Sequence, residues 1–141
     1  MLKALVPVDG SRTSERAVRH VIRLHGSGIV VEPLLINVQQ TGNAWEVQRF
    51  LKDEEIRKTQ LAHAETCLRS AKRLLDSAGI AYDTTVAFGD PAEEIAKRAK
   101  QGDFDLIVIG THGRGAFAGL LMGSVAMKVL HLTNVPLTLV K

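Results

Sequence analysis

The sequence predicts a doubly wound α/β fold, in which helices cover both faces of a five-stranded parallel sheet. Two observations lead to this prediction. Five short apolar stretches alternate with segments whose apolar residues recur at helical spacing. Each connection between strands is also long enough for a right-handed crossover. The 141 residues suffice for one domain, which we expect to span residues 1–141.

The first strand is expected from Leu2 to Val8, because this short apolar stretch is followed by the turn-forming letters DGS. A helix should come next and end near Gly26 and Gly28. The residues at helical spacing within it are Ala17, Val18, Val21, Ile22 and His25.

The second strand is expected from Ile29 to Val38, a nearly continuous apolar stretch that is typical of a strand covered on both faces. Pro33 lacks an N–H group and fits poorly at a central, fully paired position. After the polar letters QQTGN, a helical pattern runs from about Trp45 to Ala78, with Gly79 as its stop. Because this pattern is longer than a usual globular helix, we expect an irregular first portion.

The third strand is expected over residues 80–88, where the letters IAYDTTVAF alternate between apolar and polar. The following helix has clear end signals. Asp90 is its expected N-cap, Pro91 takes the first helical position, Glu93 completes a capping box and Gly102 ends the helix.

The fourth strand, Phe104 to Gly110, is the most strand-like stretch of the chain. A helix near Ser124 to Leu132 and a last strand over residues 135–140 complete the pattern. In such sheets a ligand binds at the carboxyl ends of the strands, where the strand order reverses. The letters VPVDG and VIGTHG, after the first and fourth strands, place the expected site at that edge.

The composition excludes several classes of protein. Apolar residues make up 45% of the chain and charged residues 23%, which argues against disorder. No stretch approaches the ~20 apolar residues of a membrane span, and the first residues leave no room for a signal peptide. The net charge is +3, but basic and acidic residues are mixed along the chain. We therefore expect a cytoplasmic protein with no membrane or nucleic-acid partner.

Cysteine and histidine usage gives no sign of a redox or metal centre. Cys67 is the single cysteine, so neither an internal disulfide nor a CxxC motif can form. The histidines do not cluster at the spacing of zinc ligands. They are His20, His25, His63, His112 and His131. We therefore expect no metal site built from the protein alone.

The glycines near the end of the chain follow the spacing G-x-x-G-x9-G-S, at Gly110, Gly113, Gly123 and Ser124. A dinucleotide fingerprint belongs in the first βα turn, and a Walker P-loop needs a Gly-Lys pair that the chain lacks. Gly110 and Gly113 would let the backbone turn tightly, and a helix opening at Gly123 and Ser124 would offer N–H groups to phosphate. The alternative is that the glycines only shape a long loop, with Ser124 as an ordinary N-cap.

This spacing resembles the nucleotide signature of the universal stress protein family. The string VPVDGS at Val6 to Ser11 is similar to the end of the first strand in ATP-binding members, and the GDP turn and the NVPLTLVK ending also match the family. The resemblance implies a Rossmann-like, adenine nucleotide alpha hydrolase-like fold and a bound ATP with magnesium carried by the nucleotide. It also implies a homodimer through the terminal strand, residues 135–140, whose unpaired edge would invite a second copy.

The resemblance further implies which residues contact the adenosine end of the nucleotide. Asp9, with Pro7 and Val8, would lie beside it, and Val38 would contact adenine. A carboxylate accepts hydrogen bonds from ribose hydroxyls or the adenine amino group but repels phosphate, so this role suits Asp9. The alternative is that Asp9 caps the first helix.

The remaining matched residues would contact ribose and phosphates. Ile109 and Gly110 would border the ribose. His112 and Arg114 flank Gly113 and have N–H groups to donate, although Arg114 is not part of the implied site. Ala126 offers no side-chain hydrogen bond, which would lower the affinity for phosphate. The residues implied around the phosphates are His112, Gly113, Gly123, Ser124 and Val125.

An apolar insert, residues 116–122, separates the glycine pairs. Three roles fit it: packing on the domain, covering the triphosphate, or contacting a partner subunit.

Three functions fit the sequence as a whole. The leading interpretation is an ATP-binding, dimeric factor that regulates or protects in the stress response. No catalytic residue is assigned, because no Ser-His-Asp order, paired carboxylates or base for activating water is evident. One alternative is a slow nucleotide hydrolase or phosphotransferase that uses His112 or Ser124. The other is a nucleotide-free adaptor dimer that docks through residues 116–122.

Overall fold

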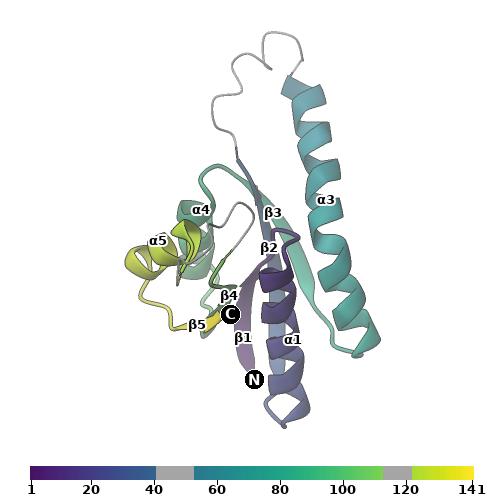
Figure 1. The fold of residues 1–141 in the computed structure, drawn as a ribbon, viewed down its shortest axis with the longest axis vertical. Helices are drawn as coiled ribbons and strands as arrows, with labels where there is room; N and C mark the ends of the chain where they lie inside the picture. The colour runs from purple at the N-terminus through teal and green to yellow at the C-terminus, as the bar shows by residue number, and fades with distance from the viewer. Residues whose placement is uncertain (41–52, 113–121) are drawn as a thin grey trace.

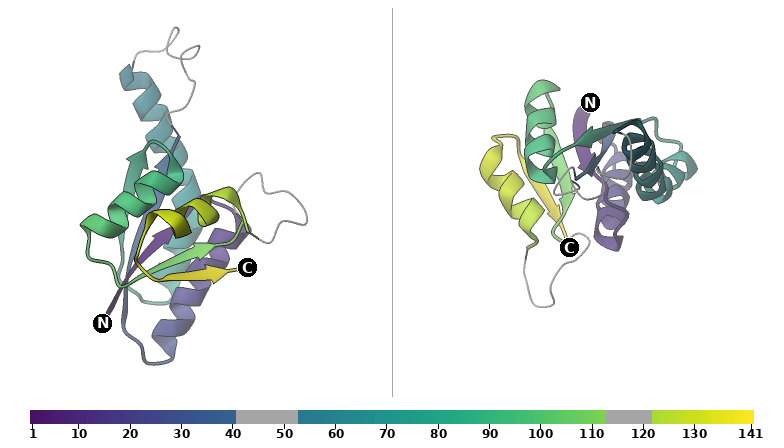
Figure 2. Two further views of the ribbon diagram at one scale, coloured as in Figure 1. Left: turned by 90° about the vertical axis from the view of Figure 1, so that its left-hand side faces the viewer. Right: turned by 90° about the horizontal axis from the view of Figure 1, so that it is seen from above.

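The structure is a computed structural model that describes residues 1–40, 53–112 and 122–141. Five strands form one parallel sheet in the order β3-β2-β1-β4-β5. Two helices, α1 and α3, cover one face of the sheet, and α4 and α5 cover the other (Figures 1 and 2). The predicted doubly wound α/β class is therefore confirmed.

The strands are β1 (Leu2–Pro7), β2 (Val31–Gln39), β3 (Asp83–Phe88), β4 (Leu106–Gly110) and β5 (Leu137–Val140). The helices are α1 (Arg12–Gly26), α3 (Asp53–Ser77), α4 (Pro91–Gln101) and α5 (Ser124–Leu132).

The sheet separates two apolar clusters, because successive side chains of a strand point to opposite faces. On β1, Ala4 and Val6 pack in the cluster beneath α1 and α3, whereas Leu5 packs in the cluster beneath α4 and α5. All three residues are fully buried. The clusters therefore fix both helical layers on the strands whose carboxyl ends form the candidate site.

The strand order reverses between β1 and β4, which are neighbours in the sheet. The chain leaves β1 for α1 on one face, and it continues from β4 to α5 on the other. Ala4 is paired with Leu106 and Leu5 with Ile107, so the segments that follow these two strands and carry Asp9 and Thr111 leave the sheet at the same edge. Such a reversal point is where ligands bind in doubly wound sheets.

Pro33 is accommodated within β2 although that strand has neighbours on both sides. The carbonyl of Ile36 accepts the Val8 N–H on the β1 side, so backbone groups of odd-numbered residues such as Pro33 point toward β3. Pairing with β3 begins only at Leu34, opposite Asp83. The missing N–H of Pro33 thus falls just before that ladder starts.

Most predicted element boundaries are close to those observed. The β2 strand is two residues shorter at its start and one residue longer at its end than expected. Within the described residues, α3 begins at Asp53 and ends at Ser77, and Gly79 follows with a φ of +69°. The expected start of this helix near Trp45 lies outside the described residues.

The Asp90 side chain caps α4 as predicted, because its carboxylate accepts the Glu93 N–H at 3.0 Å. Pro91 takes the first helical position, and Gly102 follows the helix end. Two cross-helix contacts involve Lys128 of α5. Its Nζ lies 3.1 Å from Asp90 and 3.6 Å from Glu93. These contacts join the N-terminus of α4 to α5.

Asp90→Ala should lower the free energy of unfolding by about 1 kcal/mol at pH 7, the usual value of an N-cap. The Glu93 N–H and then the Lys128 ammonium hold the pKa of Asp90 below its ordinary value. A lowered carboxyl pKa contributes stability above the unfolded pKa, and this stability is lost as the pH falls through the folded pKa. The difference in the free energy of unfolding between Asp90→Ala and wild type should therefore become smaller below about pH 4. Urea denaturation at several pH values measures it.

Asp90→Asn is the control for this prediction, because an amide oxygen still caps the helix but does not titrate in this range. It should retain most of the stability with a flatter pH dependence. An Asp90→Ala difference that stays constant from pH 7 to pH 3 would contradict the account.

Membrane-spanning and metal-binding features were sought in the described part of the chain. None of the helices there is long and apolar enough to span a membrane. In the same residues, His, Cys, Asp and Glu side chains nowhere form a group of three or more that could hold a metal ion.

Candidate functional site

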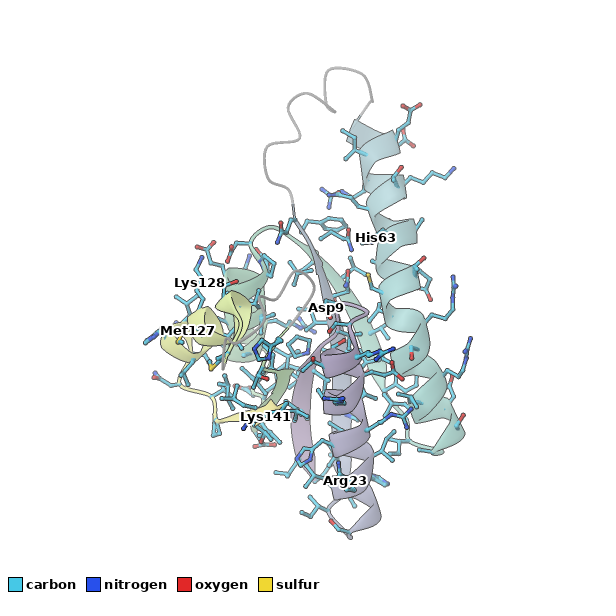
Figure 3. All side chains as sticks on the ribbon, viewed as in Figure 1. Asp9, Arg23, His63, Met127, Lys128 and Lys141 are labelled. Carbon is cyan, nitrogen blue, oxygen red and sulfur yellow. The ribbon has the colours of Figure 1, made fainter. Side chains whose placement is uncertain are left out.

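Asp9 lies at the carboxyl end of β1, at the point where the strand order reverses (Figure 3). Its Oδ1 accepts the Ser11 N–H at 2.9 Å across a turn in which Gly10 has a φ of +84°. Ser11, and not Asp9, is the N-cap of α1, because the Ser11 hydroxyl accepts the Ser14 N–H at 3.2 Å. The alternative in which Asp9 caps this helix is therefore wrong.

The N-terminus of α5 is held against the end of β4. The Gly123 N–H donates a hydrogen bond to the Thr111 carbonyl, and the Thr111 N–H donates to Val140 of β5 at 2.8 Å. Gly123 is the N-cap and makes no side-chain capping bond. These bonds bring the residue after β4 and the start of α5 together, as the sequence spacing predicted.

The first turn of α5 presents backbone N–H groups beyond those used inside the helix. The Met127 N–H donates to Gly123 at 3.1 Å, whereas the N–H groups of Ser124, Val125 and Ala126 precede this bond and have no partner within the helix. Together with the positive end of the helix dipole, such groups suit phosphate oxygens. Ser124 is exposed at the first helical position, so the alternative in which it is the N-cap is wrong.

Apolar residues at this edge of the sheet pack in the cluster beneath α4 and α5. Ile109 is buried, and Val38, Met122 and Val125 pack against the same cluster as partly buried residues. Three of these four were predicted as site residues, and the fold places them on one face of the sheet. Met122 is the one residue of the apolar insert that the structure describes, and it packs on the domain.

Val8 is placed differently from the other predicted residues. Its side chain lies in the cluster beneath α1 and α3, on the opposite face from Val38. Its N–H donates to Ile36 at 2.8 Å, and its carbonyl accepts the Asn37 side-chain amide at 2.8 Å. Pro7 is half-buried and pairs with Ile36 in the sheet register.

Gly110 ends β4 where α1 crosses it. A Cβ at this position would lie 2.7 Å from Thr13 Cγ2 and 3.0 Å from the Thr13 carbonyl carbon. Its φ is not in the left-handed region, in contrast to Gly10. The structure gives a further reason for a glycine here, because the close approach of α1 leaves no room for a Cβ.

His112 follows Thr111 and is half-buried, with its Nδ1 3.1 Å from the Thr111 hydroxyl. It directly follows Thr111, the residue whose carbonyl accepts the Gly123 N–H at the start of α5. Gly113 and Arg114, with residues 115–121 of the glycine-rich stretch, lie outside the described residues.

Sequence reasoning missed two polar residues at this edge. Thr111 is buried and bonds through its N–H and carbonyl to β5 and α5. Asn37 is buried and holds the Val8 carbonyl. A detectable signal existed for Asn37, since Asn37 and Gln39 are polar residues two apart at the end of an otherwise apolar strand.

The Lys128 ammonium contacts the carboxylates of α4 at the surface of the protein. Hydrogen bonding to Asp90 raises the pKa of Lys128, and Glu93 adds to this effect. The α4 carboxylates thus pair with the half-exposed Lys128 ammonium. The described part of the site offers phosphate the backbone N–H groups of the first α5 turn and the Ser124 hydroxyl.

Comparison with known proteins agrees with this geometry. A model of the universal stress protein family matches residues 1–141. The chain belongs to the universal stress protein family. Among its relatives is the universal stress protein YxiE of Bacillus subtilis, 29% identical over 99% of this chain and 98% of that protein. The universal stress protein MJ0577 of Methanocaldococcus jannaschii is likewise 29% identical, over 99% of this chain and 94% of its own length.

Solved structures of the family share the fold. The structure of MJ0577 superposes with a TM-score of 0.83 at 28% identity and covers 99% of this chain and 95% of that one. A universal stress protein of Archaeoglobus fulgidus in complex with dAMP superposes with a TM-score of 0.71 at 23% identity, covering 100% of this chain and 98% of that one. A family protein of Arabidopsis thaliana with AMP bound superposes with a TM-score of 0.71 at 18% identity, covering 100% of this chain and 92% of that one.

Proposed function

We propose that this universal stress protein binds ATP at the edge between β1 and β4 and serves as a cytoplasmic, nucleotide-responsive regulatory or protective factor. The observation that carries the proposal is the hydrogen bond from the Gly123 N–H to the Thr111 carbonyl. It holds the start of α5 at the end of β4, and Asp9 follows β1, which is the neighbour of β4 in the sheet. A helix start suited to anions and a carboxylate thus lie at the same edge of the sheet, where the strand order reverses.

The two ends of the site differ in the chemistry that they offer. A nucleoside fits the Asp9 side, where a carboxylate accepts hydrogen bonds and Val38 and Ile109 supply apolar surface. Phosphate fits the α5 side, where Ser124, Val125 and Ala126 offer N–H groups. This polarity matches adenosine followed by phosphates.

A magnesium ion would accompany ATP, held by the phosphate oxygens and not by a protein cage. The donor set fits this role, because the α5 start offers N–H groups for phosphate and the described residues hold no acidic metal cluster. When bound, the ion neutralises phosphate charge.

Nucleotides in related structures support an adenine ligand. The Archaeoglobus fulgidus and Arabidopsis thaliana proteins are described with dAMP and AMP. We accordingly expect the nucleotide released from freshly purified protein to have the mass of an adenine nucleotide. A guanine nucleotide in its place would contradict the proposed ligand.

Binding without rapid turnover is the proposed activity. No catalytic residue is assigned at this edge, where the described structure offers phosphate the N–H groups of the α5 start and the Ser124 hydroxyl. In a single-turnover assay with labelled ATP, hydrolysis should therefore be slower than minutes. Turnover within seconds would favour the hydrolase alternative.

The proposed homodimer would form through residues 135–140. In the described sheet, β5 is an edge strand that pairs with β4. The carbonyls of Pro136 and Val140 accept hydrogen bonds from β4 and the residue after it, so Leu139 directs its backbone N–H outward. Its side chain is 40% exposed. A second copy pairing at this edge would use that N–H and cover that side chain.

Leu139→Pro should convert the dimer into a monomer, because proline removes the outward N–H while the β4 ladder uses other residues. Sedimentation equilibrium measures the change. Leu139→Ala is the matched control, since it trims the side chain but keeps the N–H and should remain largely dimeric. A Leu139→Pro protein that is still fully dimeric would place the interface elsewhere.

A further inference from the structure

Two buried amide side chains lie near the candidate site on the face opposite Val38. Asn37 is 3% exposed and Gln39 9% exposed, although both belong to a strand that is otherwise apolar in its centre. They are two residues apart and so share the α1/α3 face with Leu35. Burial of an amide without hydrogen-bond partners is costly, so their partners show what they do.

These side chains form a continuous chain of polar contacts from β1 to α3. Asn37 Nδ2 donates to the Val8 carbonyl at 2.8 Å, and Gln39 Nε2 donates to Asn37 Oδ1 at 2.7 Å. The Gln39 Oε1 lies 3.2 Å from His63 Nδ1. On the far side of the imidazole, His63 Nε2 lies 3.9 Å from Cys67 Sγ.

The hydrogen bonds of this row of polar side chains all run in one direction. A carbonyl only accepts, so Asn37 must turn its NH₂ group to Val8 and its oxygen to Gln39. Gln39 then turns its NH₂ group to Asn37, and its oxygen needs a donor. His63 must therefore carry a hydrogen on Nδ1. One reversed amide would leave two acceptors facing each other.

The two ends of this chain have different surroundings. Val8 immediately precedes Asp9, the carboxylate proposed at the nucleoside end of the site. His63 is an exposed residue of α3, and Figure 3 shows it above Asp9. The row of polar contacts thus links the backbone beside the site to the surface of α3, a helix that contributes none of the proposed site residues.

We propose that Asn37 and Gln39 are positioning residues that fix the Val8 peptide, and through it Asp9, and that they couple nucleotide binding to α3 at His63. This inference rests on the proposed function for its ligand but not for its geometry. Coupling between two sites is reciprocal, so a change at His63 alters nucleotide affinity and nucleotide alters the environment of His63. The environment of His63 on α3 therefore changes when nucleotide occupies the site.

The affinity test uses variants along the chain. Asn37→Leu should weaken ATP binding about tenfold, the effect of losing one buried hydrogen bond that orients the site. Gln39→Leu and His63→Phe should weaken it progressively less, because each acts through the residue before it. Thr66→Ala, which removes an exposed hydroxyl from the same helix, is the matched control and should bind as wild type.

A second readout needs no nucleotide. Ring ¹⁵N shifts should show His63 with its hydrogen on Nδ1 in wild type. The backbone amide signals of Asp9, Gly10 and Ser11 should shift in His63→Phe and stay in place in Thr66→Ala. His63→Phe replaces an exposed residue, so it keeps the test independent of any folding defect in Asn37→Leu.

The outcomes separate the two proposals. If wild type fails to bind ATP, the proposed function fails, and the amide signals still decide whether the chain positions Asp9. If wild type binds, saturating ATP should shift the His63 ring signals. Unchanged Asp9–Ser11 amides in His63→Phe, or ATP affinity in folded Asn37→Leu equal to that of wild type, would overturn the inference.

Discussion

Ser124→Glu should lower the affinity for ATP by at least about tenfold while leaving the fold as stable as wild type. Ser124 is exposed at the first position of α5, where a carboxylate interacts favourably with the helix dipole by about 0.3–1 kcal/mol. The same carboxylate would repel phosphates held at this helix start. At about 4 Å, two unit charges repel by about 1–4 kcal/mol near a protein surface, and about 1.4 kcal/mol corresponds to tenfold.

Ser124→Gln is the control, because glutamine has the size of glutamate without its charge. It should lose much less affinity than Ser124→Glu when both are titrated calorimetrically. The loss in Ser124→Glu should also grow from AMP to ATP as phosphates are added. Equal losses for the two variants, or for AMP and ATP, would mean that phosphate does not lie at the start of α5.

Gly110→Ala should destabilise the protein by about 1–3 kcal/mol, the usual cost of forcing an extra carbon into a packed site. The added Cβ would lie 2.7 Å from Thr13 Cγ2 and 3.0 Å from Thr13 backbone, so α1 must move away from β4. Gly26→Ala is the matched control. A Cβ at Gly26 meets nothing within 4 Å and lies in a helix, so stability should be unchanged or higher.

Guanidinium denaturation of the single variants and of the double variant Gly110→Ala, Thr13→Ser measures this contact. Serine lacks the methyl group nearest the added carbon, so the double variant should regain part of the lost stability. The residual loss reflects the contacts with the Thr13 carbonyl carbon and Cβ, which serine keeps. A Gly110→Ala protein as stable as wild type would show that Gly110 is not required by the packing of α1.

Local signals explain why much of the fold was predictable. The caps of α4 and the bounds of α5 depend on residues close together in the chain, such as Asp90, Pro91 and Gly102. The start of β2 was less predictable, because Ile29 and Val30 are apolar yet exposed, and the strand begins only at Val31. Strand ends depend on partners elsewhere in the sheet, which apolarity alone does not identify.

The candidate site was predictable where a motif carries its own chemistry. The spacing that ends at Gly123 and Ser124 indicated a helix start near the end of β4, and the fold brings the two together. The roles of Gly110 and Asn37 were not predictable, because they depend on Thr13 of α1 and on Val8 of β1. Such contacts exist only after the strands and helices have assembled.

Isothermal titration of pure protein with ATP and magnesium tests the central claim most directly. The account predicts saturable binding, with one nucleotide per chain and an affinity tighter than millimolar. The protein should first be shown to be folded and freed of any nucleotide that co-purified with it. No binding of ATP to such protein at concentrations up to millimolar would contradict the proposal that this family member is a nucleotide-binding protein.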